Sequence, residues 1–378
     1  MRCFIAIIAI VSCLSCNSDK SDEKTGDALP PYNLLSIHCP PDVLNAYLHT
    51  QVFADSLLYG VDPALPFEIA VFDLKKKAFS HKIHLDPHFF KEKIGSFYVH
   101  CPDSIFVTGM NYPFVYIISS GGQIIQKFDL TEMNTYADYI IPSLFPYTSP
   151  YYDSKKKYLY VTTLPYDWDV LLAKTQFAER VFDLGAERMV AEYASLSTDQ
   201  AGVLPYDLNT PYRLVTDSTI IISYPARHEI EIYDKEKHEL ISKKMAGSEQ
   251  IKLSEPLSLK NNLDEQALWN YRVTVPFYEP IFYHPKAKCF TRILHHAQEL
   301  KPDGVTLNNG EKRKATLLIF DKQFRLLQAF HFTNGSLGVR KSISLPDGLL
   351  IAPHEVYWEN DNELAFQYYF KLLNFNAL

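Results

Sequence analysis

Short apolar stretches that each open at a turn residue recur along the chain, and they define its predicted architecture. After an Asp or Lys, each stretch runs through residues rich in β-branched, aromatic and leucine side chains, a composition typical of strands. Successive copies lie on average about 58 residues apart, slightly more than a common propeller blade occupies. The six copies are Asp55–Tyr59, Asp103–Val107, Lys157–Val161, Asp217–Ile222, Lys288–Thr291 and Asp347–Ile351.

A second unit follows five of these stretches and predicts a hairpin. Each is a strand that ends in an apolar residue and then meets a turn, in most copies with Asp as its first residue. The short Asp side chain can accept hydrogen bonds from nearby backbone and so favours chain reversal. These aspartates are therefore expected to form turns rather than to act in catalysis. The five strands are Ile69–Phe72, Val115–Ile118, Arg180–Phe182, Ile230–Tyr233 and Leu317–Phe320.

An inner strand and its hairpin together predict a four-stranded antiparallel sheet, and radial stacking of such sheets buries both faces of each. We therefore expect an all-β fold, a six-bladed β-propeller over residues 32–378. Little chain follows the strand expected in Asn362–Leu372, so Tyr32–Cys39 is expected to close the last blade and remove an exposed edge. The alternative is two unrelated β domains that divide near Ser248–Glu265, a stretch in which a short helix is expected near Asn262–Tyr271.

Composition supports a large β core and argues against nucleic acid as a partner. The 378 residues are 47% hydrophobic and 14% aromatic, with 25 Tyr and 24 Phe but only 14 Gly. Without the first 15 residues, which hold one basic side chain, 36 Lys and Arg face 44 Asp and Glu, a balance of −8. No Lys/Arg cluster is interleaved with aromatic residues, as a nucleic-acid surface would require.

The N-terminus has the layout of a bacterial lipoprotein signal. Arg2 precedes an apolar run, Cys3–Val11, and then two small-residue and cysteine steps end at Cys13 and Cys16. The run is too short to span a membrane, which takes about 20 residues. We expect residues 1–15 to be the signal peptide and Cys16 to carry the lipid, with Cys13 as the alternative and an ordinary secretory signal as a third interpretation.

Residues 16–31 are polar and charged and are expected to form a disordered tether. Within them, Asn17–Lys24 resembles the acidic export tag of surface lipoproteins in Bacteroidota, with a plain linker as the alternative, and the expected location is the outer membrane, on its periplasmic or its cell-surface face. Past the signal, Cys39, Cys101 and Cys289 are odd in number and far apart, which suggests neither a disulfide framework nor a zinc site. A Cys39–Cys101 bridge remains an alternative to three buried thiols.

One segment carries a family resemblance. Gly95–His100, followed by Asp103–Val107 and Tyr116–Ile125, resembles an uncharacterised family of Bacteroidota lipoproteins, a domain of unknown function with a propeller-like fold. The resemblance implies the same fold and the same cellular address. It supplies no catalytic residues.

Two groups of residues are candidates for ligand binding. One group lies on the strands expected to line the central channel; the other is a loop in which two aromatic and two acidic residues could stack on a sugar and bind its hydroxyls. Three of the channel residues are histidines, but a shift of one residue turns each to the other side of its sheet, so no metal and no cofactor are expected. The channel residues are His49, His100, Tyr152, Arg213, Tyr283 and His284, and the loop residues are Tyr166, Asp167, Trp168 and Asp169.

The sequence lacks the specific motifs of common enzyme classes, among them G-x-S-x-G, H-E-x-x-H, the phosphate-binding loop and the dinucleotide fingerprint. The expected function is therefore that of a non-enzymatic binding propeller, held at the membrane by its lipid as a monomer, with a protein or a glycan as its partner. The alternative is a propeller enzyme that acts on a polysaccharide or a small periplasmic metabolite through inner-strand His, Tyr and Arg residues.

Overall fold

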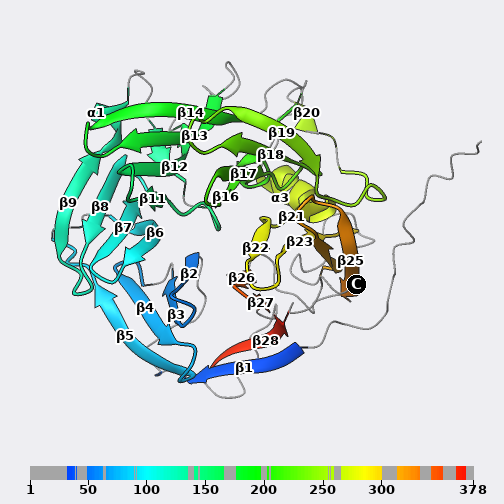
Figure 1. The fold of residues 1–378 in the computed structure, drawn as a ribbon, viewed down its shortest axis with the longest axis horizontal. Helices are drawn as coiled ribbons and strands as arrows, with labels where there is room; N and C mark the ends of the chain where they lie inside the picture. Colours follow the sequence, from blue (N-terminus) through cyan, green and yellow to red (C-terminus); the bar gives the residue numbers. More distant parts are fainter. Residues whose placement is uncertain are drawn as a thin grey trace, which may run out of the picture.

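The strands of the protein form sheets arranged radially around an axis, which makes the chain an all-β propeller in a computed structural model (Figure 1). The predicted fold class is confirmed at this level. The structure describes residues 32–38, 40, 49–62, 65–88, 90, 92–134, 140–143, 145–165, 176–196, 202–203, 206–253, 255, 257–258, 265–299, 313–332, 342–351 and 363–371.

Two sheets are simple four-stranded meanders in which each strand pairs antiparallel with the next. The innermost strand of each comes first in sequence and the outermost comes last. Their strands are β6 (Ile94–Cys101), β7 (Ser104–Gly109), β8 (Phe114–Ile118) and β9 (Ile124–Asp129), and β16 (Tyr212–Val215), β17 (Thr219–Ser223), β18 (Glu229–Asp234) and β19 (Leu240–Met245).

Two further sheets have five strands because the innermost position is shared by two short pieces. Both β10 and β11 pair with β12, and both β21 and β22 pair with β23. The strands are β10 (Ile140–Pro142), β11 (Tyr151–Asp153), β12 (Tyr158–Pro165), β13 (Gln176–Asp183) and β14 (Arg188–Leu196), and β21 (Phe277–Tyr278), β22 (Phe282–His284), β23 (Cys289–His295), β24 (Ala315–Phe320) and β25 (Leu326–Phe332).

The first and last parts of the chain share one eight-stranded sheet, of order β2-β3-β4-β5-β1-β28-β27-β26. As predicted, β1 pairs antiparallel with β28, from Tyr32↔Phe370 to His38↔Glu363. Strand β1 also touches β5 through one parallel pair, His38↔Ala78. The strands are β1 (Tyr32–His38), β2 (His49–Phe53), β3 (Leu57–Val61), β4 (Glu68–Asp73), β5 (Ala78–His84), β26 (Ser342–Leu345), β27 (Gly348–Ile351) and β28 (Glu363–Lys371).

The number of blades differs from the prediction. Within the described residues, the propeller has five sheets of four or more strands, not six. The physical reason is the contact between β1 and β5, which joins the sheet that holds both ends of the chain to the sheet of β2–β5. The repeat in the sequence marks the strand next to the innermost one in each sheet, but it cannot show that two neighbouring sheets are joined at their outer edges.

The hydrophobic core lies between neighbouring sheets. For example, Val71 and Ile83 of one sheet pack with Phe97 and Ile105 of the next, and all four are buried. This arrangement follows from strands that are apolar on both faces, since each face meets another sheet. Burial of such side chains contributes roughly 1.5–3 kcal/mol each.

The hairpin aspartates form turns, as predicted. The Oδ1 atom of Asp73 accepts hydrogen bonds from the backbone N–H groups of Lys75 and Lys76 at 2.9 and 3.0 Å. The Asp234 carboxylate does the same for Glu236 and Lys237 at 2.8 and 2.9 Å. These bonds lower the pKa of both carboxyls. The aspartates therefore act in chain reversal, which accounts for their recurrence.

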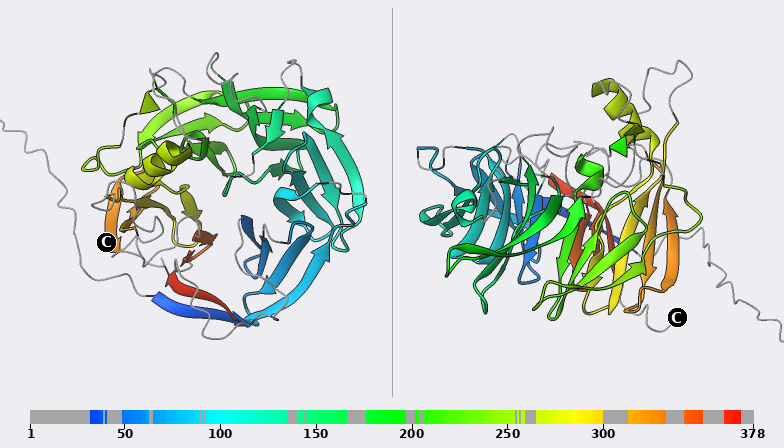
Figure 2. Two further views of the ribbon diagram at one scale, coloured as in Figure 1. Left: turned by 180° about the vertical axis from the view of Figure 1, so that it is seen from behind. Right: turned by 90° about the horizontal axis from the view of Figure 1, so that it is seen from above.

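Helices are few in the described part of the chain: α1 (Leu130–Met133), α2 (Tyr206–Asn209) and α3 (Glu265–Thr274). The third overlaps the helix predicted near Asn262–Tyr271. Figure 2 shows α3 on one side of the ring. Close to it in sequence is β20 (Leu257–Ser258), which pairs with β15 (Gly202–Val203) in a two-stranded sheet. Among the described residues, none of these helices has the length and apolarity needed to cross a membrane.

Candidate functional site

The candidate channel residues lie on the innermost strands of five different sheets, near the axis (Figure 1). The structure brings only one pair of them into a side-chain contact among the described residues: the rings of His100 and Tyr152 meet edge to face, with centroids 5.2 Å apart. The Tyr283 ring packs on that of Phe290, in its own sheet, with the ring centroids 4.9 Å apart. His49 is only 1% exposed. Whether any of these side chains binds a ligand stays a prediction.

His284 has a partner at each ring nitrogen, and the contact of Nδ1 joins its own sheet to the next. Nδ1 lies 2.8 Å from the carbonyl oxygen of Leu345, on β26, and Nε2 lies 2.8 Å from Oγ1 of Thr291, on β23. The side chain is fully buried. Burial lowers the pKa of His284 to about 4, and hydrogen bonds to the backbone of Leu345 and Gly348 oppose this effect only in part. His284 is therefore a neutral structural link at pH 7.

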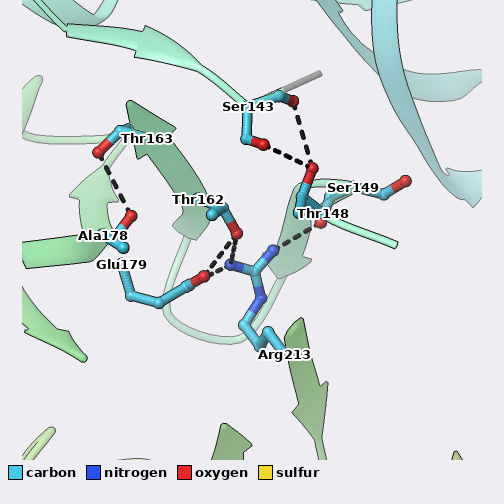
Figure 3. A network of polar contacts seen from close by, with 8 residues as sticks. All are labelled: Ser143, Thr148, Ser149, Thr162, Thr163, Ala178, Glu179 and Arg213. Carbon is cyan, nitrogen blue, oxygen red and sulfur yellow. Dashed lines mark hydrogen bonds and ion pairs between the residues drawn. The ribbon is translucent and has the colours of Figure 1, made fainter. Parts of the chain in front are cut away.

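Arg213 enters a buried polar network (Figure 3). Its guanidinium forms an ion pair with Glu179 of β13 and donates to the Ser149 carbonyl oxygen at 2.6 Å. It also lies 3.5 Å from Oγ1 of Thr162, a hydroxyl that donates to the same Glu179 carboxylate. The Arg213 side chain is 3% exposed and that of Glu179 is 0% exposed. The network thus ties β16 to the neighbouring sheet and leaves its charges mutually compensated.

Tyr147 links its own loop to three other sheets, although no prediction from the sequence included this residue. The Tyr147 hydroxyl donates to Oε2 of Glu279 at 3.2 Å and accepts from the backbone N–H of Ser342 at 2.8 Å. Its ring meets Tyr212 and Phe282 edge to face, each at 5.8 Å. No local pattern could reveal this role, because Ser342 lies 195 residues away in the sequence.

Glu279 continues this cluster into the core. Its Oε1 atom lies 2.8 Å from Nε2 of His295, and both side chains are fully buried. The His295 ring stacks on that of Phe277, with the ring centroids 4.9 Å apart. Burial, with the Glu279 charge as a smaller cause, raises the pKa of Tyr147 well above its usual value. A carboxylate, an imidazole and a phenol therefore meet near the axis, where Glu279 and His295 are fully buried and Tyr147 is partly exposed.

Arg292 is a second buried cation, and its hydrogen bonds go to backbone carbonyl groups. Its guanidinium donates to the carbonyl oxygens of Tyr224 and Ala246 at 2.8 Å and of Arg227 at 3.0 Å. It also lies 4.0 Å from the centroid of the Tyr278 ring. Burial lowers the pKa of Arg292 to about 10, so the group remains charged at pH 7. Like Arg213, it connects neighbouring sheets.

The remaining candidates fall outside these clusters. Cys16 and the loop residues Tyr166, Asp167, Trp168 and Asp169 lie outside the described residues. Cys101 and Cys289 are free thiols, while Cys39 is also outside the described part. Among the residues that the structure describes, no three His, Cys, Asp or Glu side chains are grouped so that they could hold a metal ion.

A pocket of about 650 Å³ lies far from the axis, between the end of β5 and the hairpin of β8 and β9. We call it the rim pocket. It combines an aromatic ring, an aliphatic side chain and several polar side chains. The residues that line it are His84, Asp86, Tyr116, Gly121, Gly122, Gln123, Ile124 and Lys127.

A cation and aromatic rings adjoin each other in the rim pocket. The Lys127 ammonium lies 3.4 Å from the centroid of the Phe114 ring and 5.7 Å from that of Tyr116. The Tyr116 ring packs on that of Phe90, with the ring centroids 4.7 Å apart. Burial raises the pKa of the Tyr116 hydroxyl to about 12, and the charge of Glu92 adds to this effect. Tyr116 is therefore neutral, and because it is only 4% exposed, a small part of its side chain reaches the pocket.

The rim pocket belongs to the segment that carries the family resemblance, 95–130, apart from His84 and Asp86 on the preceding sheet. The hairpin repeat in the sequence predicted only a turn after the strand Val115–Ile118. The sequence contains no signal that this turn closes a pocket against β5, since the contact depends on how two sheets meet.

Comparison with known proteins supports the fold and the family resemblance. The model of a domain of unknown function, DUF4221, matches residues 53–328. A crystal structure of a DUF4221 member from Bacteroides vulgatus is 14% identical, with a TM-score of 0.69 over 90% of this chain and 97% of that one. A Bacteroides fragilis protein described as a putative exported protein is 12% identical, with a TM-score of 0.54 over 86% and 85% of the two chains. No curated protein matches.

Proposed function

Because the chain belongs to the DUF4221 family, whose function is unknown, we propose a function from its own residues: a non-enzymatic binding propeller of the cell envelope. The observation that carries this proposal is the state of the inner-strand polar groups. Arg213, Glu179 and Glu279 meet protein partners in enclosed clusters. An enzyme needs such groups at a surface that a substrate can reach.

The buried histidines support binding over catalysis. His284 has a protein partner at each ring nitrogen and a pKa of about 4. A general base works best when its pKa lies near the working pH, and a group with two fixed partners is not free to exchange a proton with substrate. The described inner strands therefore favour a scaffold whose ligand sits elsewhere.

We also propose that the eight-stranded sheet works as two blades, which gives six in the complete ring. One residue pair joins β1 to β5, whereas six pairs join β1 to β28. In addition, Leu58 and Phe72 of β3 and β4 pack with Ile343 and Leu350 of β26 and β27. Strands so far apart in one continuous sheet would not pack together, but facing blades would.

The proposed address is the outer membrane, reached through a signal peptide of residues 1–15 and a lipid on Cys16, with residues 16–31 as the tether and the propeller acting as a monomer. The layout of the N-terminus supports it. The likeness to the Bacteroides fragilis protein described as exported is consistent with an envelope location.

Replacement of the lipidated cysteine tests the address. We expect Cys16→Ala to abolish labelling by radioactive palmitate and to move the protein from the membrane to the soluble fraction. Cys13→Ala is the matched control, because Cys13 precedes the expected cleavage site, and it should leave both unchanged. Labelling that persists in Cys16→Ala but disappears in Cys13→Ala would assign the lipid to Cys13. Labelling that persists in both variants would refute lipidation at these cysteines.

A further inference from the structure

We propose that the rim pocket binds a short saccharide, which deepens the proposed binding function and depends on it. Its volume of about 650 Å³ lies within the range of about 300–1,000 Å³ that small-molecule sites usually occupy. The pocket lies where two sheets meet at the outer side of the ring, so a ligand there would not need access to the axis.

The wall formed by the β8–β9 turn is already fixed in the unbound protein. Gly122 has a φ of +79°, and a Cβ atom there would come within 1.8 Å of the His84 carbonyl oxygen. The turn is closed by hydrogen bonds between the backbone of Ser119 and Gln123 at 3.0 Å and from Gly122 to Ser119 at 2.9 Å. A rigid wall lowers the entropy lost when a ligand binds.

The polar groups of the pocket are available to a ligand. Lys127 and Gln123 are exposed on the hairpin. The His84 side chain is 65% exposed, and because its Nδ1 lies 3.2 Å from Oε1 of Glu68, its Nε2 is the nitrogen left for a ligand. Among the described residues, no carboxylate lies within ion-pair distance of Lys127, whose ammonium instead rests over Phe114. These side chains, with exposed Asp86, can both donate and accept hydrogen bonds.

The mixture of surfaces indicates a saccharide. A sugar ring has apolar C–H faces and a rim of hydroxyls that donate and accept. Ile124, with the small exposed part of the Tyr116 ring, matches a face, and Asp86, Gln123 and Lys127 match the rim. A purely anionic ligand would be opposed by the Asp86 carboxylate, and a purely apolar one would leave the Lys127 ammonium desolvated without a partner.

The experiment is a calorimetric titration of the full chain, purified in detergent, with cellobiose, chitobiose and digalacturonate. We expect at least one of them to bind. Gln123→Ala should weaken that binding about fivefold and Lys127→Met about tenfold, as expected for a lost neutral and a lost charged hydrogen bond. Gln126→Ala is the matched control: Gln126 is exposed on the same strand but does not line the pocket, so its Kd should not change.

The outcomes separate this inference from the proposed function. Binding that Gln123→Ala and Lys127→Met weaken, while Gln126→Ala does not, supports the rim pocket. Binding that all three variants leave unchanged overturns the rim pocket but leaves a binding protein. Absence of binding by all three saccharides overturns the saccharide proposal. Cleavage of a bound saccharide, followed by chromatography, would overturn the non-enzymatic function and leave the pocket in place.

Discussion

The inner strands and the rim pocket contain the same kinds of side chain but use them differently. Near the axis, the Arg213 side chain is 3% exposed and that of Glu179 is 0% exposed, and the two opposite charges form an ion pair. At the rim, His84 is 65% exposed and Lys127 faces an open pocket. Burial and the supply of protein partners, rather than residue type, therefore separate groups that hold a fold together from groups that can meet a ligand.

The difference follows from the architecture. Inner strands converge at the axis, where polar groups lose water and must find protein partners, because an unpaired buried charge costs several kcal/mol. Outer strands diverge, so a turn that meets a neighbouring sheet can leave a hollow that remains open to solvent. A propeller whose charges near the axis are paired with one another can thus still present a binding site at its circumference.

Removal of the buried cation should have the largest effect. Arg213→Met leaves the Glu179 carboxylate buried without its partner, so we expect a loss of about 3–5 kcal/mol in the free energy of unfolding. Arg325→Met is the matched control: Arg325 also pairs with a carboxylate, Asp321, but its side chain is 78% exposed, so the loss should stay below about 1 kcal/mol. Urea unfolding measures both.

The double variant Arg213→Met/Glu179→Gln sharpens this prediction. It removes both charges, so it should recover a large part of the stability lost in Arg213→Met. A small loss in Arg213→Met, equal to that of the exposed control, would contradict the assignment of Arg213 to a buried structural network. Saccharide binding should be unchanged in any variant that remains folded, because Arg213 does not line the rim pocket.

Acid should weaken the structure through His284, an effect expected to be somewhat smaller. The pKa of His284 is about 4 in the folded protein and about 6.5 when unfolded, so between these values the unfolded chain binds the extra proton. Stability is complete above about pH 6.5 and falls by about 3 kcal/mol as the pH drops to about 4. His284→Gln, which cannot titrate, should lack this part of the loss.

Urea unfolding at several pH values between 4 and 7 measures the difference between wild type and His284→Gln. Other histidines whose pKa is lowered by burial, His228, His238 and His296, contribute the same slope to both proteins and so cancel in the comparison. Identical pH profiles for the two proteins would show that His284 is not a buried neutral link between β22 and β26.

Local features of the fold could be predicted from the sequence. Strand composition located the strand next to the innermost one in each sheet, and the turn preference of Asp predicted the role of Asp73 and Asp234. The shortage of chain after β28 predicted that β1 pairs with it. These features depend on residues close in sequence or on a general need to close an edge.

The site could not be predicted, because it depends on how sheets meet. Arg213 and Glu179 are 34 residues apart, and Tyr147 and Ser342 are 195 apart, so no short pattern links them. The contact of Gly122 with His84 likewise joins two sheets. That the structure has five sheets rather than six could not be predicted for the same reason, since the single pair between β1 and β5 is a contact of tertiary structure.

Hydrogen exchange with and without the tightest-binding saccharide of the panel tests the central claim most directly, because it locates the ligand on the intact protein. The account predicts slower exchange in peptides that cover residues 84–86 and 116–127, with no change in those that cover 147–153, 212–223 and 277–284. Slower exchange in the inner-strand peptides, with none at 116–127, would contradict it and place the ligand at the axis.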